Sequence, residues 1–351
     1  MTNAVLTTLK SITEQRVATL DPPRLAQGQA RVSIQQFALT ANNITYAATG
    51  FDIGYWKFFP SGIPDAGLVP VWGFAEVVES LSDDAPVGTR LYGFWPMASE
   101  LVITPKASKG QALRDVAEHR TALPAVYNVY QIADSPSSQD AYQALLQPLI
   151  ATSWLIADWL EDNSYFGAEQ IVIGSASSKT GLGTCAFLKG GQTKVVGLTS
   201  PGNTAFTENL GYCDDVLTYD QIEDIAQRPS VYVDMAGNAA VKRRIHAHLD
   251  QELKYSCAVG LSHWDKFEPP KDLAGPKPQF FFAPAQIAKR REDWGPGVVE
   301  QKITAATQKI AADAGRWLKL EQHSGLEAAM KAYAALAAGK ADPSIGHIVN
   351  L

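Results

Sequence analysis

The second half of the chain alternates short apolar runs with segments whose apolar residues recur at helical spacing. Residues 170–173 form a largely β-branched run, typical of a strand buried on both faces of a parallel sheet. Five small residues follow at 174–178, and the apolar positions of 182–188 then fit a helix packed on that sheet. Comparable apolar runs lie at 194–198, 214–217, 230–234 and 258–260. The alternation predicts an α/β fold with a doubly wound parallel sheet.

Residues 1 to about 110 have a different pattern, with strand-like segments between loops rich in glycine and proline. Residues 30–39 alternate apolar and polar side chains, as a half-buried strand does, and residues 74–80 repeat the alternation. Further strands are predicted at 87–94 and 100–105. We expect a β-rich domain here. A helix from residue 139, capped by Ser138 and broken near Pro148, leads to the parallel sheet.

The strand, small-residue turn and helix at 170–191 are suited to binding phosphate. The free N–H groups of a helix's first turn and the helix dipole together attract an anion. A mononucleotide P-loop would need glycine where the chain has Ile173 and Ser178, which makes a P-loop hydrolase the weakest alternative. The dinucleotide fingerprint needs small residues at three-residue spacing, which here are Ser175, Ser178 and Gly181. Only the last of the three is a glycine.

The end of the next strand bears on which dinucleotide binds. Residues 194–198 form a second buried strand that ends in Thr199 and Ser200, with no aspartate or glutamate at its tip. An acidic side chain at this position accepts the ribose hydroxyls of NAD, and its absence leaves room for the 2′-phosphate of NADP. We therefore expect NADPH in preference to NADH, with Thr199, Ser200 and Asn203 near the ribose and its phosphate.

Composition and charge exclude several classes of partner. The chain has 351 residues, enough for about two domains, and 46% of them are hydrophobic. Its net charge of −6 gives no electrostatic case for nucleic acid or an anionic membrane. No apolar stretch approaches the roughly 20 residues of a membrane helix, and no targeting segment is evident. Cys185, Cys213 and Cys257 form no CxxC motif, which fits a reducing cytoplasm.

The order of parts resembles the medium-chain dehydrogenase/reductases, and most closely their zinc-independent quinone and enoyl reductases. The N-terminal half resembles their GroES-like catalytic domain, and the second half resembles their Rossmann domain. The segments that carry the resemblance are Asn42 in the sequence NNITY, residues 70–78, residues 87–93, a strand ending at Pro105, a helix starting at Thr152, the turn at 175–181, residues 199–200, residues 210–219, residues 233–237, and the final helix and strand at 326–330 and 347–349.

The resemblance implies a division of the chain and a function. A GroES-like domain over residues 1–140, to which about 315–351 return, would be followed by a Rossmann domain over 141–314. The protein would transfer a hydride from NADPH to a carbonyl, quinone or activated double bond of a small molecule bound between the domains. Residues 280–282 read as a buried or edge strand, and in the relatives the corresponding edge pairs two subunits, so we expect a homodimer.

Two departures from the family pattern matter for chemistry. Zinc-dependent members carry Gly-His-Glu where this chain has Val71-Trp72-Gly73, and no cysteine lies in the first 180 residues, so we expect no catalytic metal. Ser178 and Lys179 replace smaller residues of the dinucleotide turn. They leave open an alternative function, a catalytically silent nucleotide-binding sensor or partner-binding protein on the same fold.

Without zinc, a side chain must supply the hydrogen bond where negative charge builds on the substrate oxygen. Tyr46, Tyr55, Tyr127 and Asn128 are the available donors. The resemblance places Tyr46 in the loop after a domain strand, at the nicotinamide end of the cleft, and aligns Asn42 with an asparagine common there. In the alternative, the tyrosines are loop or interface aromatics, and Tyr127-Asn128 is a buried turn whose amide caps backbone groups.

Lys179 has two functional interpretations, an ion pair to the cofactor's pyrophosphate or to its 2′-phosphate, and one structural alternative, a solvated first-turn lysine. Ser177 and Ser178 either donate to phosphate or cap the helix. Tyr219 matches a tyrosine that often lies near the adenine. The full set of predicted cofactor residues is Ser175, Ser177, Ser178, Lys179, Thr180, Gly181, Thr199, Ser200, Asn203, Tyr219, Gly237 and Gly260.

The histidines show no ligand spacing along the sequence. His246 and His248 are two apart and point to different faces of a helix, so they cannot chelate as an i, i+4 pair would. His263 follows a strand end on the edge where such sheets bind ligands, although a core or solvent-facing histidine is the simpler interpretation. We therefore predict no metal site.

Overall fold

The computed structural model describes residues 1–260, 272–339 and 341–351, and His263 lies outside them. The chain divides into two compact units. The first comprises Met1–Leu145, Lys319–Ala341 and Ile345–Leu351, and the second comprises Leu146–Leu318 and Asp342–Ser344. Among the described residues, no helix combines the length and apolarity that crossing a bilayer requires.

The first unit is built on two sheets that are mostly antiparallel. A nine-stranded sheet has the order β17-β18-β3-β5-β6-β10-β9-β8, with β7 paired to β3, and a three-stranded sheet has the order β2-β1-β4. The strands are β1 (Thr2–Thr8), β2 (Ser11–Leu20), β3 (Ala30–Leu39), β4 (Ala66–Leu68), β5 (Pro70–Ser80), β6 (Arg90–Pro96), β7 (Glu100–Ile103), β8 (Pro105–Ser108), β9 (Ala112–Asp115), β10 (Val129–Ile132), β17 (Lys319–Ser324) and β18 (Ile345–Asn350). The helical segments are α1 (Ala41–Ala48), η1 (Tyr55–Lys57), η2 (Glu118–Arg120), η3 (Ala125–Asn128) and α8 (Gly325–Ala337).

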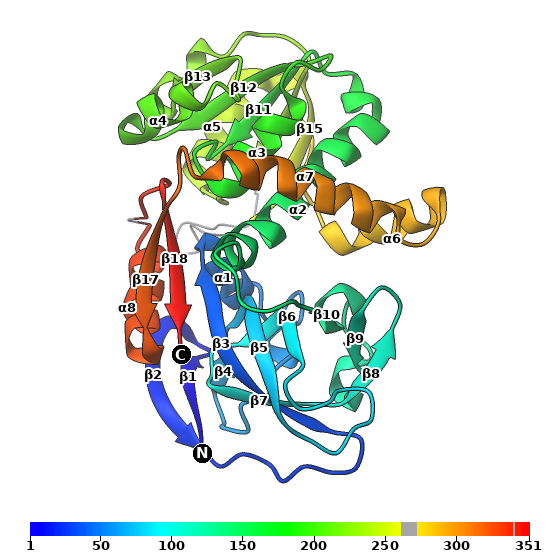
Figure 1. The fold of residues 1–351 in the computed structure, drawn as a ribbon. Helices are drawn as coiled ribbons and strands as arrows, with labels where there is room; N and C mark the ends of the chain where they lie inside the picture. The colour runs from blue at the N-terminus through cyan, green and yellow to red at the C-terminus, as the bar shows by residue number, and fades with distance from the viewer. Residues whose placement is uncertain (261–271, 340) are drawn as a thin grey trace. The chain divides into compact units, whose positions relative to one another are not determined.

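The predicted strands of this unit form, and their alternation sets which side chains are buried. In β3, Val32 and Ile34 are buried while Ser33 lies between them at the partly exposed face. Glycine is required at position 73 of β5, beside the neighbouring strand β3, because a Cβ there would lie 2.0 Å from the carbonyl oxygen of Gln36. The C-terminal segment joins the same sheet: β18 is antiparallel to β3 and parallel to β17 (Figure 1).

The second unit is a six-stranded parallel sheet with helices packed on it. Its order, β13-β12-β11-β14-β15-β16, is the 3-2-1-4-5-6 order of the Rossmann fold. The strands are β11 (Gln170–Gly174), β12 (Lys194–Thr199), β13 (Asp215–Thr218), β14 (Ser230–Asp234), β15 (Leu253–Ala258) and β16 (Gln279–Phe280). The helical segments are α2 (Asp140–Asp162), which begins in the first unit and enters the second at Leu146, η4 (Ser164–Gly167), α3 (Lys179–Leu188), η5 (Pro201–Asn203), α4 (Thr204–Leu210), η6 (Tyr219–Asp224), α5 (Ala239–Leu249), η7 (Asp250–Glu252), α6 (Ala283–Trp294) and α7 (Val298–Ala314). The predicted fold class, a GroES-like β-rich unit plus a Rossmann sheet, is confirmed.

Several local predictions need correction. The helix α2 is not broken near Pro148, because loss of one backbone N–H removes a single hydrogen bond from a helix 23 residues long. Its first turn is capped by Ser137, whose hydroxyl accepts from the N–H of Gln139, and not by Ser138. The run of three phenylalanines contributes only Phe280 to the edge strand β16, and Phe280 is 48% exposed.

Candidate functional site

The small-residue turn lies where the strand order of the parallel sheet reverses. The neighbours of β11 are β12 on one side and β14 on the other, and ligands of such sheets bind at the carboxyl edge of this switch point. Ser175 follows β11 with φ +56°, in the left-handed region. Ser178 is the N-cap of α3, and its hydroxyl accepts from the N–H of Gly181 at 3.1 Å. The helix N-terminus, with its positive partial charge, is thus held at the predicted phosphate site.

Gly181 fills the packing role expected of the last fingerprint position. A Cβ there would lie 2.5 Å from the carbonyl oxygen of Ser175 and 3.0 Å from Cα of Ala176. Both atoms belong to the backbone, so no side-chain rotation could relieve the contact. The turn and the first turn of α3 therefore pack closely only because residue 181 is glycine.

The turn and the end of β12 meet through three of the predicted residues. Thr199 Oγ1 donates to Ser177 Oγ at 2.9 Å, and Asn203 Nδ2 donates to the same oxygen at 3.3 Å. Thr199 is fully buried and Ser177 is 6% exposed, whereas Ser200 and Asn203 are half-buried. The end of β12 therefore presents uncharged hydroxyl and amide groups, as the sequence predicted.

Two groups at the turn and at the start of α3 already have hydrogen-bond partners. Tyr219, which begins η6, accepts a hydrogen bond from the N–H of Ser175 at 3.1 Å. Lys179 Nζ donates to the carbonyl oxygen of Pro343 at 3.2 Å. Burial lowers the pKa of Lys179 to about 8, partly opposed by Asp342. Lys179 is half-buried and its amine has a protein partner, so it is not a fully solvated lysine, and its role toward a cofactor stays a prediction.

The other turn residue, Thr180, ties two helices together. Its carbonyl oxygen accepts from Ser153 Oγ of α2 at 2.8 Å and from Thr184 Oγ1 at 2.9 Å. The backbone of Thr180 is thus fixed by α2, and this contact holds the N-terminus of α3 in place.

The carboxyl end of β14 contains a buried ion pair that the sequence analysis did not assign to the site. Asp234 and Lys242 are 2% and 5% exposed, and their Oδ2 and Nζ atoms lie 3.1 Å apart. The other carboxylate oxygen of Asp234 accepts from the N–H groups of Ala236 and Gly237 at 3.2 and 2.9 Å. Gly237 has φ +77°, so this loop depends on glycine there. Gly260, two residues after β15, is half-buried.

In the first unit, the predicted tyrosines belong to one aromatic cluster. Tyr46 and Tyr55 have ring centroids 4.6 Å apart, and the hydroxyl groups of Tyr55 and Tyr127 lie 3.0 Å apart. Phe94 and Trp72 complete the cluster. The ring centroid of Phe94 lies 5.4 Å from that of Tyr46 and 5.2 Å from that of Trp72. Tyr46 lies in α1 and not in a loop, because Thr40 and Asn43 form a capping box that starts a helix directly after β3.

The hydroxyl of Tyr46 has two side-chain hydrogen-bond partners. Its oxygen accepts from Asn42 Nδ2 at 2.7 Å and from Trp72 Nε1 at 3.1 Å. Burial raises the pKa of Tyr46 well above its ordinary value, and the two N–H groups act in the opposite direction because they stabilise the phenolate. The structure thus brings Asn42 and Tyr46 together and adds Trp72, which the sequence analysis did not include among the candidate donors.

Asn128 is held by a buried arginine. Arg120 is 1% exposed, and its Nε donates to Asn128 Oδ1 at 2.9 Å while Asn128 Nδ2 donates to the carbonyl oxygen of Arg120 at 2.9 Å. Arg120 also pairs with Asp115 at 2.7 Å and donates to the Tyr130 hydroxyl at 2.6 Å. This geometry favours the alternative in which the amide of Asn128 orders a buried turn.

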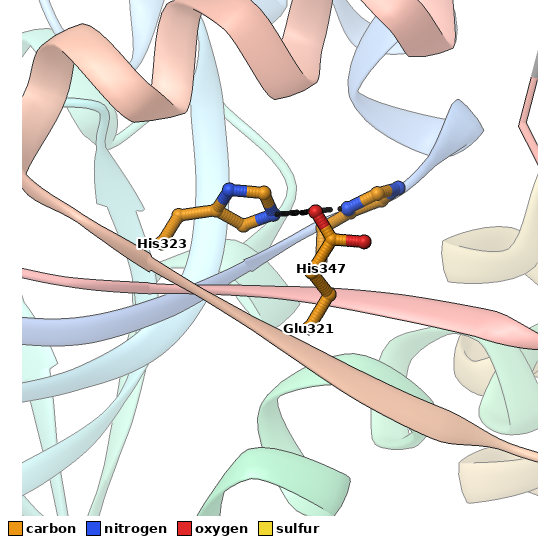
Figure 2. A group of neighbouring side chains, drawn as sticks. All are labelled: Glu321, His323 and His347. Carbon is orange, nitrogen blue, oxygen red and sulfur yellow. Dashed lines mark hydrogen bonds and ion pairs between the residues drawn. The ribbon is translucent and has the colours of Figure 1, made fainter.

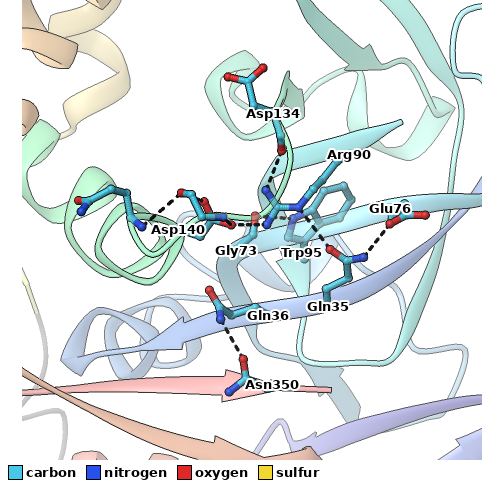
Figure 3. Close-up of polar contacts among 11 residues, drawn as sticks. Gln35, Gln36, Gly73, Glu76, Arg90, Trp95, Asp134, Asp140 and Asn350 are labelled. Carbon is cyan, nitrogen blue, oxygen red and sulfur yellow. Dashed lines mark hydrogen bonds and ion pairs between the residues drawn. The ribbon is translucent and has the colours of Figure 1, made fainter. Parts of the chain in front are cut away.

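A polar cavity of about 330 Å³ lies elsewhere in the first unit, beside Arg90, Tyr92 and Asp140. Arg90 lies over the ring of Phe74 at 4.2 Å. It also pairs with Asp140 at 2.5 Å (Figure 3). Its other nitrogens donate to the carbonyl oxygen of Asp134 and to Gln35. Because these partners already engage the guanidinium, it holds β6 to the start of α2.

The sequence also matches a family model. Residues 37–342 match the family described as "Protein of unknown function (DUF2855)". The chain belongs to the DUF2855 family. No curated protein matches its sequence.

The DUF2855 protein shares its fold over nearly its whole length with several solved structures, among them two oxidoreductases. CurA from Vibrio vulnificus superposes with a TM-score of 0.67 and 14% identity, covering 100% of this chain and 98% of that one. The quinone oxidoreductase from Coxiella burnetii gives 0.56 and 16%, covering 100% and 99%. The yhdH oxidoreductase from Salmonella enterica, solved in complex with NADP, gives 0.57 and 17%, covering 100% of both chains. The resemblance to medium-chain quinone and enoyl reductases is confirmed at the level of the fold.

Proposed function

We propose that this DUF2855 protein binds NADPH at the carboxyl edge of its parallel sheet and transfers a hydride to a carbonyl, quinone or activated double bond of a small molecule, without a catalytic metal. The observation that carries the proposal is the turn from Ser175 to Gly181, which sets the N-terminus of α3 at the switch point of a 3-2-1-4-5-6 sheet. The backbone clash that any Cβ at Gly181 would cause indicates that a close approach is built in at this turn.

The residues present fit NADPH in particular. The turn residues and the N-terminus of α3 would hold the pyrophosphate. Ser177 already accepts two hydrogen bonds, so its single O–H is left to donate to a ligand oxygen. With Ser200 and Asn203 it would hold the ribose and its 2′-phosphate, where a carboxylate would repel the phosphate. Structures of CurA and of the yhdH oxidoreductase were solved with NADPH and NADP, which supports the same cofactor here.

Nicotinamide chemistry supplies the hydride, and the chain must supply a hydrogen bond to the substrate oxygen. We assign this role to Tyr46. Both lone-pair directions of its oxygen are occupied by the N–H groups of Asn42 and Trp72, so its O–H is the group that remains to donate. The same two N–H groups would stabilise negative charge on the Tyr46 oxygen if the proton moved to substrate. Tyr127 and Tyr55 would line the same aromatic cluster.

The alternative function is a nucleotide-binding sensor without turnover. It is favoured by the partners that the turn region already has, namely the hydroxyl of Tyr219 at Ser175 and the carbonyl of Pro343 at Lys179. The protein would then bind the nucleotide by displacing these contacts, and the aromatic cluster would serve as core.

Cofactor titration tests the first half of the proposal. We expect NADPH to bind more tightly than NADH, with ATP as the control nucleotide, followed by nicotinamide fluorescence and thermal unfolding. At 100 times its dissociation constant a ligand adds about 2.7 kcal/mol of stability, which a melting curve detects easily. If neither nicotinamide cofactor binds, the reductase proposal fails.

Turnover tests the second half. We expect NADPH oxidation with at least one member of a panel of quinones, enones and aldehydes, and a drop in kcat of about 10²-fold or more in Tyr46→Phe, since one positioned proton donor contributes about 10²–10⁴-fold. Tyr333→Phe is the matched control, because the buried hydroxyl of Tyr333 has no hydrogen-bond partner among the described residues. Tight NADPH binding with no turnover on any substrate would favour the sensor.

We further propose a homodimer and a cytoplasmic location. The edge strand β16 leaves its outer side unpaired among the described strands and exposes Phe280, which supports an edge contact between subunits. All three cysteines are free and buried, which supports a reducing compartment. Sedimentation of the wild type and of Phe280→Asp tests the dimer, and a wild-type monomer would refute it.

A further inference from the structure

Two histidines and a glutamate that are far apart in sequence meet on one face of the first unit's sheet. The strands β17 and β18 are parallel, with Glu321 directly opposite His347 in the register. His323 lies two residues after Glu321, and residues two apart on a strand project to the same face. Figure 2 shows the three side chains converging, although α8 lies between the two strands in the sequence.

The distances match those that one metal ion would impose. His323 Nε2 lies 3.0 Å from His347 Nδ1 and 3.6 Å from Glu321 Oε1. A tetrahedral Zn²⁺ with bonds of about 2.0–2.2 Å holds its ligand atoms about 3.3–3.6 Å apart. The three ligand atoms all lie within 4.8 Å of one another, so only small rotations of the side chains are needed. The hydrogen bond brings the two imidazole nitrogens together, and a metal ion would replace the proton between them.

We propose that Glu321, His323 and His347 bind a divalent transition-metal ion of the Zn²⁺ class. Two imidazole nitrogens and one carboxylate suit Zn²⁺ and its neighbours, whereas Mg²⁺ and Ca²⁺ prefer oxygen ligands alone. Three protein ligands leave the fourth position of a tetrahedral site open. Glu321 is 50% exposed and His323 is 15% exposed in their side chains, so the ion would reach the site from solvent.

The site differs from the zinc sites expected of zinc-dependent relatives, whose motif position is held here by Val71-Trp72-Gly73. Its ligands come from rigid strands and from both ends of the segment β17-α8-β18. A bound ion would link the edge strand β17 to β18 and so resist fraying of that edge. The proposal is independent of NADPH, because every ligand lies in the first unit and metal binding is measured without cofactor.

The test uses untagged full-length protein freed of metal by a chelator. Titration with Zn²⁺, followed by calorimetry, is expected to give one ion per chain, and Co²⁺ is expected to give the visible absorption of a tetrahedral site. His323→Ala and His347→Ala should each weaken Zn²⁺ binding at least tenfold, because even the loss of a group that only orients a metal ligand costs about 10–100-fold. Glu321→Gln should weaken it less.

Two control variants separate a specific site from adventitious binding. Gln322→Ala changes the same strand on its opposite face, and His119→Ala removes a histidine remote in sequence, so both should keep wild-type Zn²⁺ affinity. Zn²⁺ should raise the melting temperature of the wild type and of both controls but not of His323→Ala, while Mg²⁺ changes none. Absence of Zn²⁺ binding by the wild type, or binding that survives both histidine substitutions, would overturn the proposal.

Discussion

Gly181→Ala is the sharpest test of the turn as a cofactor site. An added Cβ would lie 2.5 Å from the carbonyl oxygen of Ser175, about 1 Å short of ordinary contact, and 3.0 Å from Cα of Ala176. Overpacking of this kind costs about 1–3 kcal/mol. Alanine is a better helix former than glycine by about 1 kcal/mol, so the net loss of stability is about 2 kcal/mol at most. The loop must move to relieve the contact, and the groups that it presents to pyrophosphate must move with it.

The expected result is therefore selective. Nicotinamide fluorescence should show NADPH affinity reduced at least about tenfold in Gly181→Ala, which corresponds to about 1.4 kcal/mol. Gly183→Ala is the matched control on the same helix. Its Cβ would meet Ser153 Oγ at 2.6 Å and Ile150 Cδ1 at 2.9 Å, which are side-chain atoms on α2 and not part of the turn. It should lower thermal stability and weaken NADPH binding less than Gly181→Ala does, because Ser153 reaches the turn only through its hydrogen bond to the carbonyl oxygen of Thr180.

Two outcomes would refute this reasoning. If Gly181→Ala bound NADPH as tightly as the wild type, the turn would not be where the pyrophosphate sits. If both glycine variants weakened NADPH equally, the loss would come from the packing of α3 on α2, and the close approach at Gly181 would have no role of its own.

Two further predictions concern charge in the core. Arg120→Met should lower the free energy of unfolding, measured in urea, by about 3–5 kcal/mol, because it leaves Asp115 buried without its partner. Arg244→Met is the control: it removes an exposed ion pair and should lower the free energy of unfolding by under about 1 kcal/mol. Lys179 has a pKa lowered by burial to about 8 from an ordinary 10.5, so the unfolded chain binds more protons between these values. The stability of the wild type relative to Lys179→Met should rise as pH increases from about 8 to 10, and a constant difference would contradict the burial of its amine.

Local patterns in the sequence were sufficient to predict the parallel sheet. Each of its first four strands is an apolar run whose neighbours along the chain are helices, so the period of the hydrophobic pattern changes at every boundary. The fifth strand was predicted at 258–260, but β15 spans Leu253–Ala258, where polar residues interrupt the apolar pattern. The Ser177–Thr199–Asn203 contact was also predictable, because the carboxyl ends of adjacent parallel strands lie at one edge. The placement of Tyr46 in a loop was wrong because Thr40 and Asn43 cap each other, a signal that the sequence carries but that was not used.

Other features depend on contacts that no local pattern reveals. His323 and His347 meet because β17 and β18 pair in one particular register, and a shift of one residue would place them on opposite faces. The partnership of Asp234 with Lys242 likewise depends on how α5 packs after β14. In each case the residue types are ordinary in sequence, and only the tertiary pairing makes them a site.

The departures from glycine in the turn bear less on activity than the sequence suggests. Ser178 has φ −66° and ψ 150°, which any residue adopts, and its hydroxyl caps α3, so serine brings no backbone strain. Lys179 donates to the carbonyl of Pro343, and a phosphate oxygen would accept a hydrogen bond about twice as strong as the one that a neutral carbonyl accepts. Both residues are therefore compatible with a bound pyrophosphate. If the protein binds NADPH but does not turn over, the cause must be sought in the aromatic cluster around Tyr46 and not in the turn.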